Sequence, residues 1–161
     1  MSPQHRRYLV FEQGIGAGVV NLALNAAIAW LLFRGAATVP LWGQQSIGGD
    51  TIGTTFLLPF ITTLIASRIV RGHVRSGRVP ALAWSEPSML RRLPAGLAGR
   101  GAVLGLACIV LVGVPATFLL GSAGVGAMTF RGFVAFKALF AAALAMVVTP
   151  LIARAALADP V

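Results

Sequence analysis

Four long apolar stretches restrict this chain more than any other feature of its sequence. They run over residues 9–33, 52–70, 102–120 and 132–152. The hydrocarbon core of a bilayer is about 30 Å thick, and a helix needs roughly 20 mainly apolar residues to cross it. Because no water is present there to satisfy backbone N–H and C=O groups, each stretch is predicted to cross as an α-helix. The chain is 57% hydrophobic and 11% charged, whereas an ordinary soluble domain has about 25% charged residues, so a soluble globule is excluded.

The first stretch is expected to be a retained span rather than a secretory signal peptide. Glu12, Gln13, Asn21 and Asn25 interrupt it, and it is longer than the apolar region of a signal peptide. The only cysteine, Cys108, lies within the third stretch. The sequence therefore offers no disulfide framework and no pair of thiols for a metal or redox centre.

The basic residues segregate to the two sides of the predicted spans. Three fall on one side: Arg34, Arg131 and Lys137. Ten fall on the other: Arg6, Arg7, Arg68, Arg71, Arg75, Arg78, Arg91, Arg92, Arg100 and Arg154. Because Lys and Arg are enriched in cytoplasmic segments, both termini and the loop 72–100 are predicted to be cytoplasmic. The predicted fold is an all-α integral membrane four-helix bundle, N-in/C-in, made of two consecutive transmembrane hairpins in one domain, residues 1–161.

The net charge of +9 indicates a lipid partner rather than nucleic acid. The arginines flank apolar spans on the cytoplasmic side, where anionic lipid headgroups are a sufficient partner for them. We therefore expect no nucleic-acid binding. Within the cytoplasmic loop, Ser85 or Ser88 is a candidate N-cap for one short interfacial helix.

Small residues in the spans predict where helices pack closely. In the first span, Gly14 and Gly18 continue into Asn21 and Asn25 along one helical face. Glycines at this spacing let two helix backbones approach, and the asparagines can form interhelical hydrogen bonds. Packing is the favoured interpretation of this face, with solute binding as the alternative. In the third span, Gly101 and Gly105 indicate a second helix contact.

The second span carries unusual polar chemistry. Asp50 lies at its outer end, where an N-cap would satisfy free N–H groups. Thr51, Thr55 and Thr62 share one face with Pro59, and such threonines either line a solute path or bond the carbonyl one turn back. Pro59 and, in the fourth span, Pro150 each free a backbone carbonyl and predict a kink: Thr55 and Met146 are the residues whose carbonyls are freed.

Ionisable residues at membrane depth are costly unless they are paired or hydrated. Lys137 lies inside the outer end of the fourth span, and we expect its long side chain to reach Asp50, with Arg131 as the competing partner of that carboxylate. Glu12 lies just past the cytoplasmic interface. Its expected partner is one of three cytoplasmic arginines: Arg68, Arg71 or Arg154.

No pattern of residues typical of catalysis is present. His5 and His73 lack metal-ligand spacing, the four acidic residues are scattered, and no glycine-rich phosphate loop follows a strand. We expect neither an enzyme nor a bound metal or cofactor.

Three segments resemble a group of small bacterial inner-membrane proteins that are loosely called permeases. The segments are YLVFEQGIG, VPLWGQQSIGGDTIGTTFLLPF and FRGFVAFKALFAAALAMVVTPLIA, and the resemblance covers most of the chain. It implies a multi-pass protein of the bacterial inner membrane, without a substrate or a site. The size is also similar to that of small multidrug transporters, but Glu12 is too near the start of its span and the cytoplasmic loop is too long for that function to be carried over.

Two functions are consistent with these features. The first is a small permease or channel-like transporter, oligomeric because four helices give little room for an aqueous path. The second is a non-transport module that packs against a membrane protein partner or organises anionic lipid. Transport requires the polar side chains to face a hydrated cavity, whereas the module requires them to be mutually satisfied.

Overall fold

The computed structural model describes residues 2–82 and 93–159. Its helices form continuous helical runs. The first helical run consists of α1 (Pro3–Arg7), η1 (Tyr8–Ile15) and α2 (Gly16–Phe33), and the second is α3 (Ile47–Arg75). The third consists of α4 (Leu97–Cys108), η3 (Ile109–Gly113) and α5 (Val114–Ser122), and the fourth is α6 (Phe130–Leu157). The candidate caps Ser85 and Ser88 lie outside the described residues, as do Arg91 and Arg92.

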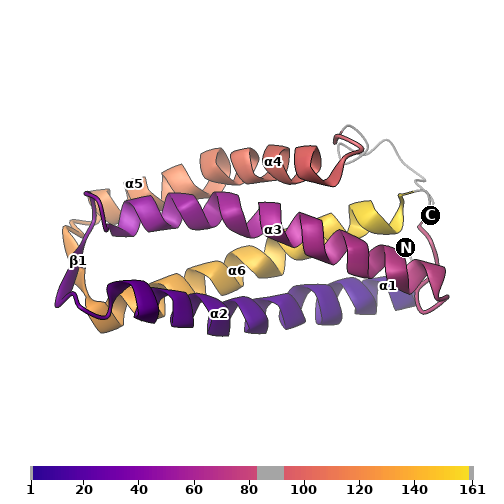
Figure 1. Ribbon diagram of the computed structural model, residues 1–161, viewed down its shortest axis with the longest axis horizontal. Helices are drawn as coiled ribbons and strands as arrows, with labels where there is room; N and C mark the ends of the chain where they lie inside the picture. Colours follow the sequence, from indigo (N-terminus) through magenta and orange to yellow (C-terminus); the bar gives the residue numbers. More distant parts are fainter. Residues whose placement is uncertain (1, 83–92, 160–161) are drawn as a thin grey trace.

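Four of these helical runs are long and apolar enough to cross a membrane, as the sequence predicts. They run over Pro3–Phe33, Ile47–Arg75, Leu97–Ser122 and Phe130–Leu157, so each is longer than its apolar stretch. The helices extend beyond the stretches because hydropathy marks only the apolar part of a helix, while its hydrogen bonding continues through polar turns at the ends. The result is a mainly helical bundle with its long axis along the helices (Figure 1).

The two ends of the bundle differ in the residues and elements that they contain. Figure 1 shows that the two ends of the chain lie at the same end of the bundle. Arg71 and Arg100 lie there because both bond Asp159, and Arg78 lies there because it pairs with Glu12 of the first helical run; we call this the arginine-rich end. At the opposite end, the strand end, β1 (Thr38–Pro40) pairs antiparallel with β2 (Ala127–Thr129). Val39 lies opposite Met128 in this two-stranded sheet, which ties the loop before α3 to the loop before α6. The sequence analysis did not predict this pairing.

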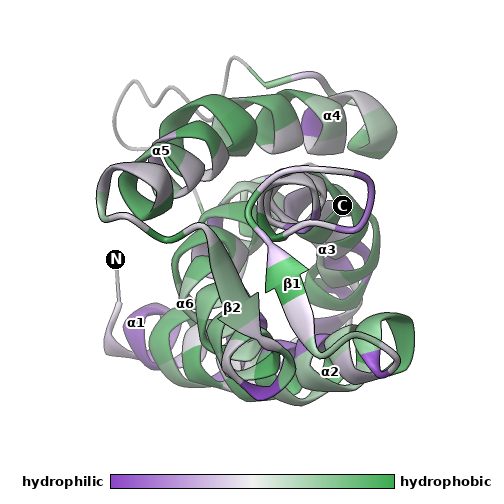
Figure 2. Cartoon of the chain, turned by 90° about the vertical axis from the view of Figure 1, so that its left-hand side faces the viewer, coloured by the Kyte–Doolittle hydropathy of each residue, from purple (hydrophilic) through white to green (hydrophobic). Residues whose placement is uncertain are grey.

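Helix α6 is the common packing partner of the bundle. The first helical run and α3 both pack on α6, whereas α4 and α5 pack on α3 (Figure 2). Small residues make α6 suitable for this position, because side chains without bulk allow close approach on several faces. Seven alanines are buried along the helix: Ala138, Ala141, Ala142, Ala145, Ala153, Ala155 and Ala156.

The predicted glycine faces lie at helix contacts. A Cβ built on Gly18 would be 2.6 Å from Met146 Cγ of α6, and one on Gly14 would be 3.5 Å from Pro150 Cγ. On α4, a Cβ on Gly105 would be 2.7 Å from Phe56 Cδ2 of α3 and 2.9 Å from its carbonyl oxygen. Gly101 lies one turn earlier against the Phe60 backbone, with 3.1 Å between its built Cβ and that carbonyl oxygen.

Both internal prolines lie within continuous helices. Pro59 is inside α3 and Pro150 is inside α6, and neither ends its helix. Around Pro59, the Thr63 hydroxyl donates to the Pro59 carbonyl at 2.7 Å, which satisfies one polar group next to the interruption. Pro150 cannot donate a hydrogen bond to the Met146 carbonyl. This carbonyl oxygen lies 3.6 Å from the position of a Cβ built on Gly14, so the absence of a side chain at Gly14 lets the first helical run pack closely on α6 there.

We predict that adding a methyl group at Gly105 destabilises the protein, whereas adding one at Gly53 does not. The added Cβ at Gly105 would collide with the Phe56 backbone, and such overpacking costs about 1–3 kcal/mol. At Gly53, also in a long apolar helix, the added Cβ has no neighbouring atom within 4 Å. Thermal unfolding of Gly105→Ala and Gly53→Ala in detergent measures the difference. Equal midpoints for the two variants would contradict close packing of α4 on α3.

Candidate binding groove

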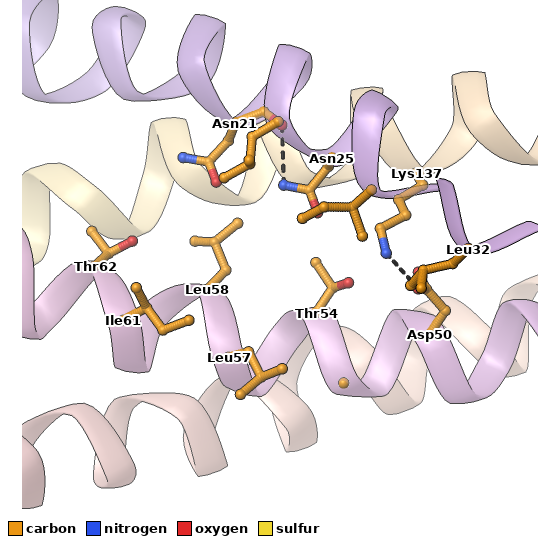
Figure 3. A pocket seen from close by; sticks show the side chains of 13 residues that line it. Asn21, Asn25, Leu32, Asp50, Thr54, Leu57, Leu58, Ile61, Thr62 and Lys137 are labelled. Carbon is orange, nitrogen blue, oxygen red and sulfur yellow. Dashed lines mark hydrogen bonds and ion pairs between the residues drawn. The ribbon is translucent and has the colours of Figure 1, made fainter. Parts of the chain in front are cut away.

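A cavity of about 310 Å³ lies between α2 and α3. Helix α6 contributes one side chain to it, that of Lys137 (Figure 3). We call this cavity the groove. It is lined by Asn21, Leu24, Asn25, Ile28, Leu32, Asp50, Gly53, Thr54, Leu57, Leu58, Ile61, Thr62 and Lys137. Six of these residues are leucine or isoleucine and six are polar or charged, so apolar walls and polar groups both face the space, as in many small-molecule sites.

An ion pair between Asp50 of α3 and Lys137 of α6 lies at one end of the groove (Figure 3). The side chain of Lys137 is 5% exposed and that of Asp50 is 12% exposed. Asp50 lies in the first turn of α3, where the positive end of the helix dipole favours a carboxylate. Lys137 lies about two turns into α6, and its stem reaches across to α3.

Asp50 is not the N-cap that the sequence suggests. The cap is Ser46, whose side chain accepts a hydrogen bond from the Gly49 N–H at 3.2 Å. Helix α3 therefore begins at Ile47, before its apolar stretch, and includes Gly48 and Gly49. Asp50 is therefore inside the helix, and its carboxylate is available to Lys137.

The ion pair does not use all the hydrogen-bonding capacity of its two side chains. An ammonium group has three donors, and a carboxylate has two oxygens that can each accept more than one hydrogen bond. Within the described residues, Lys137 Nζ donates only to Asp50 Oδ1. Two lysine donors and the second carboxylate oxygen are left for water or a ligand in the groove.

Two asparagines of α2 line the groove beside the ion pair. Asn21 Nδ2 donates to the Ala17 carbonyl at 2.9 Å, and Asn25 Nδ2 donates to the Asn21 carbonyl at 3.0 Å. Each asparagine therefore bonds its own helix rather than crossing to another one. Among the described residues, nothing donates to the two side-chain oxygens, so both remain acceptors on the groove wall.

The threonines of α3 divide differently from the sequence prediction. Thr62 lines the groove, but Thr51 and Thr55 are buried and donate to carbonyls of their own helix, Ile47 at 2.7 Å and Ile52 at 2.8 Å. Thr55 also lies against the third helical run, since a Cβ built on Gly113 would be 2.5 Å from its hydroxyl oxygen.

The groove-facing threonine that the sequence analysis missed is Thr54. Thr54 lies one helical turn after Asp50 and therefore on the same face of α3. The spacing from Asp50 thus predicts which threonine faces the groove, whereas the pattern of threonines alone does not.

The other ionisable residues lie away from the groove. Arg131 does not pair with Asp50 in the described structure; it lines a separate hollow with Trp30. Glu12 pairs with Arg78 at 2.8 Å rather than with one of the three arginines predicted for it. Arg78 lies in the turn that follows α3 at the arginine-rich end. This turn folds back over the first helix, and the pattern of apolar spans in the sequence does not predict that contact.

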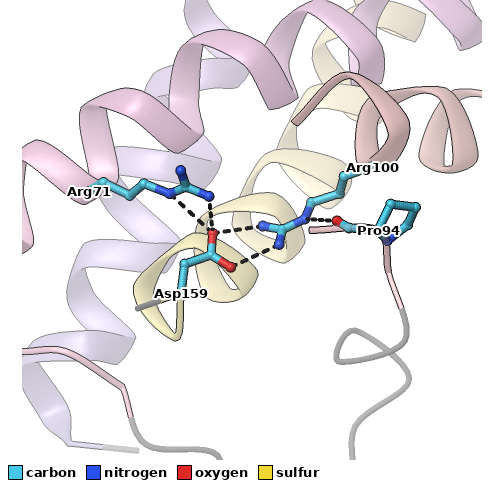
Figure 4. Close-up of polar contacts among 4 residues, drawn as sticks. All are labelled: Arg71, Pro94, Arg100 and Asp159. Carbon is cyan, nitrogen blue, oxygen red and sulfur yellow. Dashed lines mark hydrogen bonds and ion pairs between the residues drawn. The ribbon is translucent and has the colours of Figure 1, made fainter. Parts of the chain in front are cut away.

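A second polar cluster fastens the arginine-rich end (Figure 4). Asp159, which follows α6, accepts hydrogen bonds from Arg71 of α3 at 2.7 Å and from Arg100 of α4 at 2.8 Å. Arg100 is 5% exposed, and its Nε donates to the Pro94 carbonyl at 3.3 Å. One carboxylate thus joins three segments of the chain, and we call the three charged residues the Asp159 clamp. The sequence analysis did not identify it.

The two arginines change the ionisation of Asp159. Burial tends to raise the pKa of its carboxyl group, but hydrogen bonds from Arg100 and Arg71, and their positive charges, outweigh this effect and hold the pKa below its usual value. A depressed carboxyl pKa means that the folded state favours the ionised form. The clamp therefore stabilises the fold above the unfolded-state pKa, and this stabilisation is lost as the pH falls below it.

A third polar network lies at the start of the first helical run. Tyr8 begins the π-helical segment η1, and its hydroxyl lies 2.9 Å from His73 Nδ1 of α3 and 3.1 Å from Gln13 Nε2. Tyr8 and Gln13 are five residues apart, which the wider π-helical turn places on one face. His73 Nε2 lies 3.3 Å from Arg78, which pairs with Glu12, so this network joins α3 to the first helix.

The described residues contain no group of three or more His, Cys, Asp or Glu side chains that could hold a metal ion. No protein-family model matches the chain, and no curated protein or solved structure shows significant similarity to it. The functional assignment therefore depends on the geometry of the site.

We predict that Asp50 and Lys137 are energetically coupled. Removing one partner leaves a buried unpaired charge, which costs about 3–5 kcal/mol when burial is complete. Asp50→Asn and Lys137→Met should each destabilise the protein, and the double variant should be more stable than additivity predicts, by about 1–3 kcal/mol. Unfolding of all four proteins in detergent measures this coupling. Additive effects would show that the two charges are independently satisfied.

We also predict that Asp159→Asn lowers the stability at neutral pH by about 1–3 kcal/mol, between the values for exposed and buried pairs. The difference from the unsubstituted protein should shrink as the pH falls below about 4, because the unfolded chain then binds a proton at this carboxyl group, and it should be lost once the pH is also below the depressed pKa of the folded state. The matched control is Glu12→Gln, which breaks an ion pair with side chains 47% and 56% exposed and should cost less than about 1 kcal/mol. Equal losses from the two variants would contradict a structural role for the clamp.

Proposed function

We propose that this chain is a small permease-like transporter of the bacterial inner membrane, and that the groove is its solute-binding site. The observation that supports it most directly is the buried Asp50–Lys137 pair in an apolar groove, with hydrogen-bonding capacity left over on both charges. A charged side chain at membrane depth is costly, and such residues mark solute or ion paths more often than not.

The origin of the site residues also favours transport. The groove takes Asn25 from α2, Asp50 from α3 and Lys137 from α6, three separate spanning helices. A ligand that bonds all three changes the relative energy of different helix arrangements, which is the coupling that a transporter needs. A site on one rigid helix could not provide it.

The proposed orientation has the arginine-rich end and both termini in the cytoplasm, by the distribution of basic residues. The groove then lies in the outer half of the membrane. The Asp159 clamp and a buried apolar cluster that includes Tyr8, Val70 and Leu157 close the cytoplasmic end. In this proposal, a solute can leave the groove toward the cytoplasm only if the end that carries the Asp159 clamp opens. The arrangement is then that of a state closed to the cytoplasm.

The alternative is a non-transport membrane module, supported by one specific observation. The third helical run packs mainly on α3, and large side chains on its outer face are exposed, among them Leu111 at 74% and Phe118 at 71%. Such a surface suits lipid and also a partner helix or a second copy of the chain. The same surface is consistent with an oligomeric transporter.

A flux experiment distinguishes the two functions. Purified protein in liposomes is tested for uptake of radiolabelled glycine, ethanolamine, acetate and urea, for proton movement with pyranine, and for movement of an acyl-labelled fluorescent phosphatidylethanolamine between leaflets. We expect one of these probes to move at least several-fold faster than in empty liposomes. The blocking variant is Gly53→Leu, because Gly53 lines the groove and an added Cβ there has no atom within 4 Å, so the larger side chain extends into the groove.

The matched control is Gly72→Leu, which lies in the same helix outside the groove and whose added Cβ also has no atom within 4 Å. Flux should be lost in Gly53→Leu and kept in Gly72→Leu. If no probe moves, or if Gly53→Leu moves it as fast as Gly72→Leu does, transport through the groove is wrong and the module becomes the better assignment.

A further inference from the structure

We propose that the ligand of the groove is a membrane-borne zwitterionic amphipath, which enters sideways from the bilayer between α2 and α3 with its polar head at Asp50 and Lys137. This inference rests on the groove as the binding site of the proposed function. It goes further by naming the class of ligand and the route by which it arrives.

The groove opens toward the side of the bundle. Four apolar residues on its walls have about half of their surface exposed: Leu24 at 54%, Leu32 at 60%, Leu57 at 52% and Ile61 at 47%. They belong to α2 and α3, which pack on α6 rather than closely on each other. In a bilayer, these side chains face lipid acyl chains, so an apolar tail can lie along the opening while the head is inside.

The strand end closes the direct path from water to the ion pair. Phe133 lies one turn nearer that end than Lys137, and Ile47 precedes Asp50 in α3; both are fully buried. Their cluster continues to Val39 of β1 and to Phe33 of α2, whose ring centroid is 4.6 Å from that of Phe133. All three helices that form the groove contribute to this plug, and β1 covers it. This packing favours a lateral route to the ion pair over an axial one.

The ion pair favours a head with both charges and no net charge. Asp50 and Lys137 neutralise each other, so a ligand with a net charge would leave one charge unpaired in a nearly dry site. A zwitterion avoids this, because its cationic group can bond the free Asp50 oxygen while its anionic group accepts the two free Lys137 donors. The side-chain oxygens of Asn21 and Asn25 add acceptors for an ammonium group.

The size of the groove agrees with a head group rather than with a whole lipid. A volume of about 310 Å³ holds roughly ten water molecules at about 30 Å³ each. A phosphoethanolamine head has a comparable number of non-hydrogen atoms. The acyl tail must then remain in the lateral opening, which is what the half-exposed wall residues allow.

Binding of three matched probes tests the proposal independently of transport. Lysophosphatidylethanolamine has both the zwitterionic head and a tail, glycerophosphoethanolamine has the same net-neutral zwitterionic head without a tail, and a monoacylglycerol has the tail with an uncharged head. Native mass spectrometry of the detergent-solubilised protein measures the occupancy of each. We expect lysophosphatidylethanolamine to bind at least tenfold more tightly than either of the other two.

The variants localise this binding. Gly53→Leu should lower the affinity for lysophosphatidylethanolamine at least tenfold, and Gly72→Leu should leave it unchanged. Lys137→Met should reduce the preference over the monoacylglycerol. If thermal unfolding shows that Gly53→Leu is not folded, Ile61→Trp replaces it, since a larger side chain at that position covers the half-exposed opening.

The outcomes separate this proposal from the proposed function. If glycerophosphoethanolamine binds as tightly as the lysolipid, or if Gly53→Leu binds the lysolipid normally, the lateral amphipath proposal is wrong. A water-soluble solute that moves across liposomes and is blocked by Gly53→Leu would still support transport. Groove-specific lysolipid binding with no flux of any probe would support this inference and remove the transport assignment.

Discussion

The close packing of α6 against its neighbours is the interaction on which the rest of the structure depends. In a bilayer, apolar side chains gain little from leaving lipid, so helices are held by van der Waals contact and a small number of polar links. The alanines of α6 and the glycines of the first helical run and α4 allow this contact. Because α2 and α3 both lie against α6, they leave a space between themselves, and the groove is a direct result of that arrangement.

The polar links are placed at different depths and differ in character. Asp50 and Lys137 join α3 to α6 in the half of the bundle near the strand end, while Asp159 joins the end of α6 to α3 and α4 at the arginine-rich end. The first has a cavity beside it, and the second is enclosed by arginine donors. This difference is the reason for assigning a binding role to Asp50 and Lys137 and a structural role to Asp159.

Hydropathy was sufficient to predict four helices and the segments that form them, because the bilayer length requirement is strict. Glycine spacing also indicated faces that lie at helix contacts, as for Gly18 and Gly105. The threonines were harder to place, because Thr54 and Thr55 are adjacent in the sequence and point to different neighbours, and only the position of α6 decides which one faces the groove. Asp159 could not be predicted, since its partners come from helices far apart in the sequence.

The two-stranded sheet has a mechanical consequence. By pairing Val39 with Met128, it joins the loop between the first two spanning helices to the loop between the last two. The two helical hairpins are thus fastened to each other at the strand end by backbone hydrogen bonds. At the other end an apolar cluster holds them together with the Asp159 clamp, which a change of ionisation can release. A rearrangement of the two hairpins would therefore pivot about the sheet. The largest displacement would occur at the arginine-rich end, with little change of structure around Val39.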